Sequence, residues 1–343
     1  MAPRYDAFML VSFGGPEGPD DVMPFLRNVV RGRDVPDERL RRVAANYEHF
    51  GGVSPINGQC RALITALREE LAQHGHRMPV YWGNRNWRPL LADTLREMAG
   101  DGVRHALAFV TSAYSSWSGC RQYLDDIERA RTEVGDAAPR VDKLRVYYNH
   151  PGFIEPLAEH VDAAFGRIPE DRRSAARLVF TAHSLPRSLA TTSDYEVQLK
   201  ETAALVAFAL GRPEWSLVYQ SRSGPPSQPW LEPDIVDHLR ALAASGARDA
   251  VVAPIGFISD HMEVVYDLDL DAKSRAIEVG LNMVRAATVG IHPRFVQMIR
   301  ELVEERLSDE PVRQALGTRG PAPDVCPPDC CPAGAPPTRP PPG

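Results

Sequence analysis

Hydrophobic and polar positions alternate between two kinds of segment along most of this 343-residue chain. Short apolar runs of strand length are followed by longer segments in which apolar residues recur at helical spacing. Strands and helices that alternate in this way build parallel sheets covered by helices on both faces, so the pattern predicts an α/β protein. The expected strands are residues 7–13, 80–83, 105–111, 143–148, 177–183, 216–220, 250–255 and 282–286, and the expected helices are residues 20–30, 37–47, 57–74, 90–98, 121–132, 151–165, 194–210, 233–244, 262–279 and 293–307.

The predicted elements divide into two similar halves of four strands. Each half ends a strand in a polar signature, TSAYS at 111–115 and TAHS at 181–184. We therefore predict two similar doubly wound, Rossmann-like lobes, whose parallel four-stranded sheets flank a cleft. The first lobe spans residues 1–165; the second spans 166–315, and its last helix could pack back on the first. Ligands of such folds bind beyond the carboxyl ends of the strands, where both signatures fall.

The composition narrows the class of protein. A chain with 43% hydrophobic and 24% charged residues is typical of a soluble globular protein. A formal net charge of −6 argues against electrostatic binding of nucleic acid, which needs a basic face. The apolar run at 7–13 is too short to cross a membrane and lacks the flanks of a signal peptide. We expect a cytoplasmic monomer without a membrane span.

His183 is the first candidate for chemistry, because it ends the apolar strand LVFTAH at residues 178–183. A histidine in that position is most often a hydrogen-bonded boundary residue. Ser184 and Pro186, however, predict a fixed loop directly after it, which favours a ring that faces the cleft. An imidazole, whose ordinary pKa is near neutral, can accept protons or bind a metal there.

Three acids follow the strand at 250–255 and form the second candidate. Glu263, Asp267 and Asp271 recur at i, i+4 and i+8, which places them on one face of the expected helix. A solvated acidic face is the plainer interpretation. The acids begin at the predicted cleft mouth, however, and oxygen ligands in a row could relay a hydrated divalent cation toward a neutral imidazole.

Three other glycine- and proline-rich stretches are interpreted as structural elements, two as turns and one as a wall of the cleft. Gly14 and Gly15 follow the first strand, but the chain has no G-x-G-x-x-G and no P-loop lysine there, so they predict a tight turn and not a nucleotide site. The segment at 50–57 reads as a turn between two helices with Ser54 as a cap. The rigid polar stretch at 220–230 suits a cleft wall.

Together these motifs resemble the ferrochelatase family, the enzymes that insert ferrous iron into a porphyrin. The resemblance runs from residue 6 to about 307 in the family's order and implies its chelatase-type, two-lobed fold. The matching motifs are SFGGP at 12–16, GGVSP at 51–55, TAHSLP at 181–186, QSRSGP at 220–225 and DHME at 260–263.

The resemblance implies roles for particular residues. His183 and Glu263 become the catalytic, iron-side pair, with Asp267 and Asp271 as a candidate relay. Within the family, the chain looks most like the actinobacterial branch, which implies coproporphyrin III and Fe2+ as substrates and a haem-pathway enzyme as a candidate partner. The porphyrin-binding residues implied in the same way are Ser54, Tyr123, Phe13, Arg31 and Tyr47.

The chain also departs from the family's pattern. Relatives in other Gram-positive bacteria have a tyrosine where this chain has Phe13, on the side of the macrocycle opposite the histidine. Phenylalanine cannot ligate a metal, so that role is lost. Arginines near the propionates of those relatives are replaced by Val30 and Asn46, while Arg31 and Tyr47 are kept.

The tail at 316–343 has a composition of its own. Ten of the 31 prolines lie in residues 321–343, which excludes a helix or a central strand. Cys326, Cys330 and Cys331 crowd into six residues, and their clustering favours a metal site over incidental cysteines. Four thiolates suit a [2Fe–2S] cluster or zinc, and Cys120 and Cys60 are both available as the fourth. Neighbouring cysteines in extended backbone point apart, so a turn is required at 330–331.

The resemblance selects among these options. Some ferrochelatases hold a [2Fe–2S] cluster with one internal and three C-terminal cysteines, and in actinobacterial members the internal one directly precedes the helix with the porphyrin-contacting tyrosine. Cys120 and Tyr123 match that arrangement, so Cys120 is the implied ligand with the three tail cysteines. Alternative functions are a protoporphyrin IX ferrochelatase, a cobalt chelatase and a porphyrin carrier.

Overall fold

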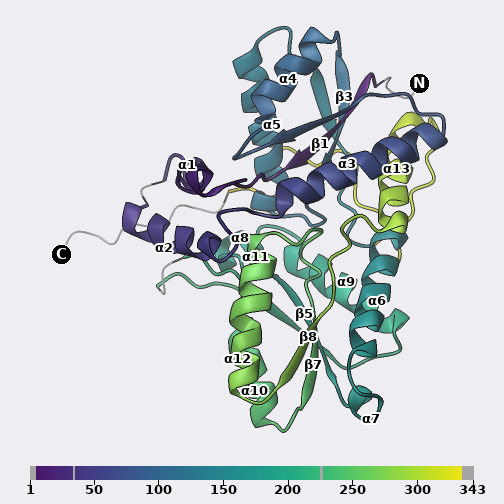
Figure 1. Ribbon diagram of the computed structural model, residues 1–343. Coiled ribbons are helices and arrows are strands. Elements are labelled where there is room, and N and C mark those ends of the chain that lie inside the picture. The colour runs from purple at the N-terminus through teal and green to yellow at the C-terminus, as the bar shows by residue number, and fades with distance from the viewer. Residues whose placement is uncertain (1–4, 34, 225–226, 334–343) are drawn as a thin grey trace.

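The computed structural model describes residues 5–33, 35–224 and 227–333, in which two parallel sheets lie one above the other (Figure 1). The first contains β1 (Ala7–Ser12), β2 (Val80–Asn84), β3 (His105–Val110) and β4 (Arg140–Lys143) in the order β2-β1-β3-β4. The second contains β5 (Arg177–His183), β6 (Trp215–Gln220), β7 (Asp249–Ala253) and β8 (Asn282–Arg285) in the order β6-β5-β7-β8. The predicted α/β class and the two four-stranded parallel sheets are confirmed.

The helices cover both faces of each sheet. The N-terminal lobe contains α1 (Pro19–Val29), α2 (Asp37–Glu48), α3 (Ile56–Gln73), α4 (Leu91–Gly100), the π-helix η1 (Trp117–Arg121) and α5 (Gln122–Val134). The rest of the described chain contains α6 (Pro151–Gly166), α7 (Glu170–Arg173), α8 (Arg187–Ala190), α9 (Tyr195–Ala209), α10 (Ile235–Ala244), α11 (Met262–Val264), the π-helix η2 (Val265–Ala272), α12 (Lys273–Glu278) and α13 (Pro293–Leu307). We propose the boundary between the lobes near residue 165, at the end of α6.

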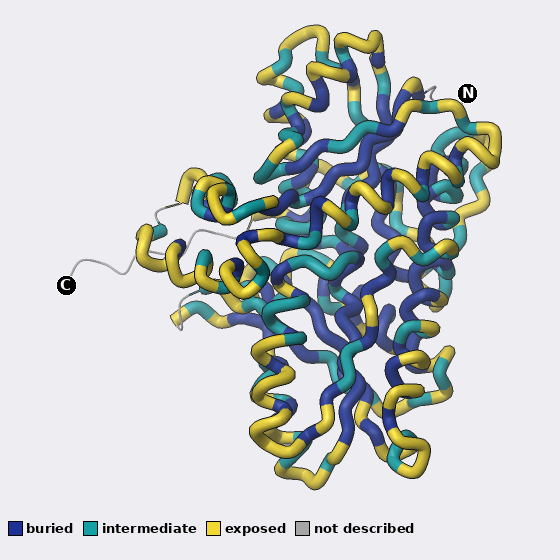
Figure 2. Tube along the Cα trace, in the orientation of Figure 1, coloured by how far each residue is buried: buried dark blue, intermediate teal, exposed yellow. Residues whose placement is uncertain are grey.

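One continuous core lies between the two sheets. It joins strand residues of both lobes, such as Phe8 and Phe180, to the inner faces of α3, α6, α9 and α13. Smaller clusters lie on the outer faces, under α4 and α5 in one lobe and under α10 and α12 in the other. Figure 2 shows the strands as the buried interior of the molecule. All six residues of β1 are buried, as expected of a central parallel strand covered on both faces.

Helix α13 packs against α3 and α6 and so ties the end of the folded chain to the first lobe (Figure 1). A buried ion pair also holds α13 to the segment that follows β4: Arg145 donates from Nε to Oε2 of Glu305 at 2.7 Å and from Nη2 to Oε1 at 2.8 Å. Removing one partner of such a pair leaves an uncompensated buried charge, which costs about 3–5 kcal/mol.

The two sheets have equivalent positions. In the first sheet Ser12 pairs with Asn84, and in the second His183 pairs with Gln220, each at the carboxyl end of its strand. A π-helix also follows the third strand of each sheet, η1 after β3 and η2 shortly after β7. His183 is therefore the counterpart of Ser12.

Two predicted elements are wrong in detail. The strand expected at 143–148 is paired only at 140–143, because the chain then leaves the sheet and carries Tyr147 and Tyr148 into the core. The ring of Tyr147 stacks on Phe109 with the ring centres 4.9 Å apart. An apolar run thus marked burial and not a strand. The single helix expected at 262–279 is α11, η2 and α12 in succession.

Candidate active site at the carboxyl ends of the strands

His183 ends β5 and is held in one orientation by its neighbours. Its Nδ1–H donates to the carbonyl oxygen of Ser184 at 2.6 Å, and its own carbonyl accepts a hydrogen bond from the hydroxyl of Tyr195 at 3.0 Å. Because Nδ1 donates to a carbonyl, Nε2 is the nitrogen free to exchange a proton or bind a metal. Nε2 lies 3.2 Å from Oε1 of Glu263. The sequence predicted this pair, and the fold brings it into contact across 80 residues.

Glu263 lies in α11, at the start of the segment that η2 continues. His261 caps α11, since its Nδ1 accepts a hydrogen bond from the backbone N–H of Glu263 at 3.1 Å. The carbonyl of Glu263 also accepts a hydrogen bond from the side chain of Gln220. The carboxylate itself is 48% exposed and the His183 side chain 27%, so solvent reaches both groups.

The pair is strongly polarised. Burial alone would lower the pKa of His183, but the Glu263 carboxylate and the hydrogen bond to Ser184 outweigh it and raise the pKa to about 9. Burial would raise the pKa of Glu263, yet the charges of His183 and His261 lower it to about 2. At neutral pH the pair is therefore an imidazolium and a carboxylate. This differs from the neutral imidazole that the ordinary pKa of histidine suggested.

Asp267 lies in η2 and is the acid that titrates near neutrality. Burial raises its pKa to about 7, and the charge of Glu263 adds to this. Ser221 donates a hydrogen bond to its carboxylate from a left-handed backbone conformation with φ +63°. Such a conformation is uncommon for a serine and recurs at functional sites. Asp271, the last of the three acids, is exposed and lies 3.6 Å from Nε of Arg275.

The residues expected to contact a porphyrin lie on the N-terminal lobe. Ser54 and Tyr123 are buried, and Phe13 is partly buried. Tyr47 packs in one apolar cluster with Phe25 and Met262, the residue before Glu263, and Phe13 packs against that cluster. The charge of Glu263 reaches Tyr47, where it adds to burial in raising the phenol pKa. The cluster thus joins the two predicted sides of the site.

Arg31 is exposed just beyond the end of α1 and follows Val30, which packs against that apolar cluster. Its Nη2 donates to Oδ1 of Asn28 at 2.7 Å.

Arg85 lies beside Tyr123 and Phe13, and the sequence did not mark it as a candidate. Its guanidinium carbon lies 4.5 Å from the ring centre of Tyr123 and 5.8 Å from that of Phe13. The buried carboxylate of Asp126 neutralises it. Arg85 directly follows β2, so its position beyond a strand end was the signal available in the sequence.

Gln59 and Arg285 were also missed, and both hold Asp260. The side-chain Oε1 of Gln59 accepts from the backbone N–H of Asp260 at 2.8 Å. Arg285 donates from Nη1 to Oδ1 of Asp260 at 2.9 Å and from Nε to Oδ1 of Asp269 at 2.6 Å. No local pattern around Gln59 marks it, because its partner is 201 residues away.

Four of the five cysteines, all except Cys60, lie at or near η1. Cys120 is buried there, and Arg121 donates from Nη1 to the carbonyl of Pro328 at 2.8 Å, which holds the tail against the π-helix. Burial, with the nearby thiols of Cys330 and Cys120, raises the pKa of Cys326 to about 11. Cys331 has φ +53°, and its sulfur lies 3.4 Å from that of Cys330, so the expected turn is present.

The geometry at the cysteines is not that of a finished metal site. Within the described ranges, no three His, Cys, Asp or Glu side chains are arranged to hold a metal ion. The donor set fits a four-thiolate group in kind, but the fold alone does not bring four thiols into ligand positions.

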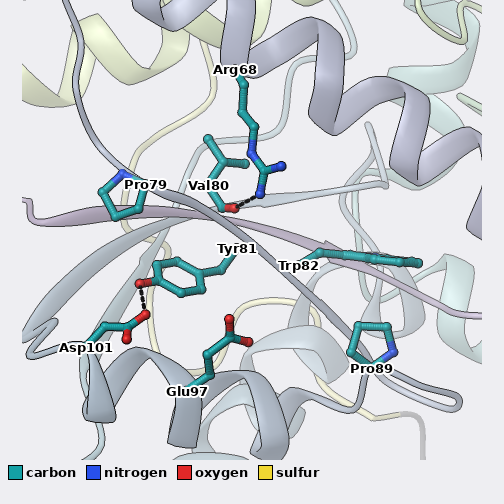
Figure 3. A pocket seen from close by; sticks show the side chains of 8 residues that line it. All are labelled: Arg68, Pro79, Val80, Tyr81, Trp82, Pro89, Glu97 and Asp101. Atoms are coloured by element: carbon teal, nitrogen blue, oxygen red, sulfur yellow. Dashed lines mark hydrogen bonds between the residues drawn. The ribbon is translucent and has the colours of Figure 1, made fainter.

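Two hollows lie outside the His183–Glu263 pair. One of about 480 Å3 is at the outer edge of the N-terminal lobe, where Tyr81 points to Asp101 and Arg68 reaches the carbonyl of Val80 (Figure 3). It is lined by none of the predicted site residues. The other, of about 300 Å3, reaches the site only through Ser184, which follows His183.

The architecture is shared with solved chelatase-like structures. One is DR2241 from Deinococcus radiodurans, a multi-domain protein with structural similarity to chelatases, at TM-score 0.53 and 16% identity. That likeness covers 92% of this chain and 57% of the other, just over half its length. The other is SirB from Bacillus subtilis, solved with Fe3+, at TM-score 0.52 and 12% identity over 88% and 96% of the two chains. At such identities the likeness concerns the fold alone.

Sequence relatives identify the family. Residues 5–307 match the family model described as ferrochelatase, and this chain belongs to the ferrochelatase family. It is 54% identical to a protein of Rhodopirellula baltica named ferrochelatase, over 95% of this chain and 93% of the other. It is 52% identical to proteins of Streptomyces griseus and Streptomyces coelicolor named coproporphyrin III ferrochelatase, over 94% and 95% of this chain and 92% and 93% of theirs. None of the described helices is long and apolar enough to cross a membrane.

Proposed function

We propose that this protein inserts Fe2+ into coproporphyrin III and that His183 and Glu263 carry the reaction. The 3.2 Å contact between the two side chains, at the carboxyl end of β5, is the observation that carries the proposal. The 52% identity to proteins named coproporphyrin III ferrochelatase supports the choice of porphyrin.

The reaction exchanges one Fe2+ for the two protons of the pyrrole N–H groups. Once iron has passed to the macrocycle, Nε2 of His183 accepts one of these protons, and the other leaves through the carboxylates of Glu263 and Asp267 to solvent. One imidazole and one carboxylate, completed by water, bind the substrate iron weakly enough to release it to the macrocycle. Because His183 is protonated at neutral pH, iron must displace that proton before Nε2 is available. Asp267, with a pKa of about 7, is the nearby acid best matched to receive it. The exposed Asp271 then marks the way to solvent.

The N-terminal lobe supplies the porphyrin-binding wall. Phe13 offers a partly exposed ring to the macrocycle, and the buried Tyr47, Tyr123 and Ser54 complete the wall around it. Arg85, neutralised by Asp126, orients the rings of Phe13 and Tyr123 and is not free to pair a propionate. Arg31 is exposed at the rim and suits a propionate carboxylate. No metal ligand stands at Phe13, so the iron enters from the His183 side.

A [2Fe–2S] cluster is the second part of the proposal. Cys120, Cys326, Cys330 and Cys331 would be its ligands. The hydrogen bond that holds the tail to η1 and the influence of the Cys120 thiol on the pKa values of Cys326 and Cys331 support this set. Cys60 has a different environment, since its thiol hydrogen-bonds with Ser12. The cluster would pin the tail to the helix that bears Tyr123. Visible absorbance together with iron and sulfide assays tests this, and purified protein without either would exclude the cluster.

None of the five cysteines, all of which lie in the described ranges, forms a disulfide, which fits the reducing cytoplasm that we propose as the location.

One assay tests the activity against its alternatives. Fe2+ and Co2+ are offered with coproporphyrin III, protoporphyrin IX and sirohydrochlorin, and metal insertion is followed by absorbance. We expect the highest kcat/KM for Fe2+ with coproporphyrin III. Preference for protoporphyrin IX would reassign the porphyrin, preference for Co2+ with sirohydrochlorin would reassign the enzyme, and binding without turnover would indicate a carrier.

A further inference from the structure

Two glutamines join the lobes by equivalent contacts. Gln59, on α3, accepts from the backbone N–H of Asp260 at 2.8 Å and donates to its carbonyl at 3.1 Å. Gln198, on α9, accepts from the backbone N–H of Ser115 at 2.7 Å and donates to its hydroxyl at 2.9 Å. Helices α3 and α9 each connect the first two strands of their own sheet, and Asp260 and Ser115 each follow the third strand of the other sheet.

Gln59 holds the residue from which the iron-side segment begins. Asp260 is followed by His261, which caps α11, and by Glu263. Within its own lobe, the Asp260 carboxylate accepts from Arg285 and from Thr288 at 3.2 Å. From the opposite lobe, the side chain of Gln59 adds two hydrogen bonds to the backbone of Asp260. The position of α11 is therefore set by both lobes.

Gln198 holds the corresponding residue on the porphyrin side. Ser115 is followed by Ser116, whose hydroxyl accepts from the backbone N–H of Gly119 at 2.8 Å and caps η1. Helix α5 continues η1 and contains Tyr123. The segment that leads into each π-helix therefore starts at a residue held by the other lobe, Ser115 before η1 and Asp260 before α11 and η2.

We propose that Gln59 is a positioning residue for Glu263, and Gln198 its counterpart for Tyr123, so that each lobe sets the geometry of the other's site element. This inference rests on the proposed function, in which Glu263 receives iron and Tyr123 contacts the porphyrin. Gln59 bonds to both backbone groups of Asp260 and so fixes the position and direction of that peptide, and Gln198 fixes the backbone N–H and the side chain of Ser115. Without Gln59 the Asp260 backbone pairs with water, and the Glu263 carboxylate no longer has a fixed distance from Nε2 of His183.

The test compares Gln59→Leu with Gln198→Leu, since each removes one clasp while nearly keeping its volume. Loss of a supporting hydrogen bond to a metal ligand typically costs about 10- to 100-fold in affinity or activity. We expect Gln59→Leu to raise KM for Fe2+ by about tenfold and leave KM for coproporphyrin III unchanged. Gln198→Leu should do the reverse. Binding of Co2+ by calorimetry and of coproporphyrin III by fluorescence, without turnover, should divide in the same way.

Two further measurements keep the inference separate from general loosening of the fold. Thermal unfolding of both variants is measured, because similar losses of stability cannot produce opposite selectivities. Gln59→Glu keeps the acceptor for the Asp260 N–H but loses the donor, so its KM for Fe2+ should be intermediate; it also serves if Gln59→Leu does not fold. Equal changes of both KM values in both variants, or no change, would overturn the inference.

A double substitution shows whether Gln59 acts through Glu263. In a Glu263→Gln background, Gln59→Leu should have no further effect on KM for Fe2+, because the group that it positions is already altered. If Glu263→Gln alone keeps wild-type iron kinetics, the proposed iron site fails. If Glu263→Gln is impaired and the effect of Gln59→Leu simply adds to it, only the positioning role fails.

Discussion

At the end of the first strand of its sheet the N-terminal lobe has Ser12 and Phe13, whereas the C-terminal lobe has His183 and Ser184. After the third strand, the first lobe places Cys120 in its π-helix, and the second places acids in and before its own. The backbone frames correspond, but the side chains do not. One lobe supplies rings and a neutralised arginine, and the other supplies groups that exchange protons and bind cations.

The fold thus provides equivalent positions at the strand ends of both lobes, and the side chains there differ because one lobe is proposed to bind the porphyrin and the other the iron. A flat macrocycle needs a wide apolar wall, while an incoming cation needs oxygen and nitrogen donors. Substitutions at the strand ends and at the π-helices, where the two lobes carry different side chains, test this division of tasks.

The largest effect is expected at the strand ends. His183→Ala should lower the rate of iron insertion by about a hundred- to ten-thousandfold, because it removes the group that exchanges the pyrrole protons. Binding of coproporphyrin III, measured by fluorescence, should remain. Ser12→Ala changes the equivalent position of the other lobe and should keep turnover within a few-fold of wild type. Turnover of His183→Ala in that same range would sink the assignment.

Glu263→Gln should come next, with kcat lower by about a hundredfold at saturating iron. It should also lower the pKa of His183 from about 9 toward its ordinary 6.5, because the neighbouring negative charge is lost. Folding raises this pKa, so the associated stability is fully present below pH 6.5 and is lost as pH rises through about 9.

Histidine NMR titration and urea unfolding across that pH window measure both effects. Glu278→Gln, an exposed acid of α12 paired with Arg275, is the matched control and should change neither. An unaltered His183 titration in Glu263→Gln would contradict the coupling.

Asp267→Asn should have a smaller effect, about tenfold on kcat. In the wild type, insertion should rise as pH passes about 7, where this carboxyl ionises, and the substitution should abolish that rise. Folding raises the pKa of Asp267 from 3.8 to about 7. The free energy of unfolding should therefore fall as pH rises from about 4 to about 7 in the wild type, and it should fall less in the variant. Asp93→Asn, an exposed acid of α4, is the control. A pH–rate profile that keeps its step near 7 in Asp267→Asn would assign the step elsewhere.

The smallest kinetic effect is expected at Cys120, on the porphyrin-side π-helix. Cys120→Ser should remove the visible absorbance of a [2Fe–2S] cluster and change kcat less than His183→Ala, Glu263→Gln or Asp267→Asn, because this residue touches no reacting atom. Cys60→Ser, also buried but hydrogen-bonded with Ser12, should keep the absorbance. Equal absorbance in both variants would remove Cys120 from the ligand set.

The sequence by itself determined the alternation of strands and helices, the two halves and the residues at the strand ends. The apolar run at residues 7–12, followed by a glycine turn, indicates a central strand covered on both faces, and the motif TAHSLP marks His183 in the sequence. It could not separate the buried run at 144–148 from a strand, because apolar content reports burial and not pairing.

Only the tertiary structure decided how the site is held. Gln59 and Asp260 are 201 residues apart, and Ser115 and Gln198 are 83 apart, so no local pattern marks either contact. The pKa values of His183 and Asp267 likewise depend on burial and on charges brought close by folding. The two π-helices were also not visible in the sequence, because a wider helical turn is stabilised by the residues that pack against it and not by the helix propensity of its own residues.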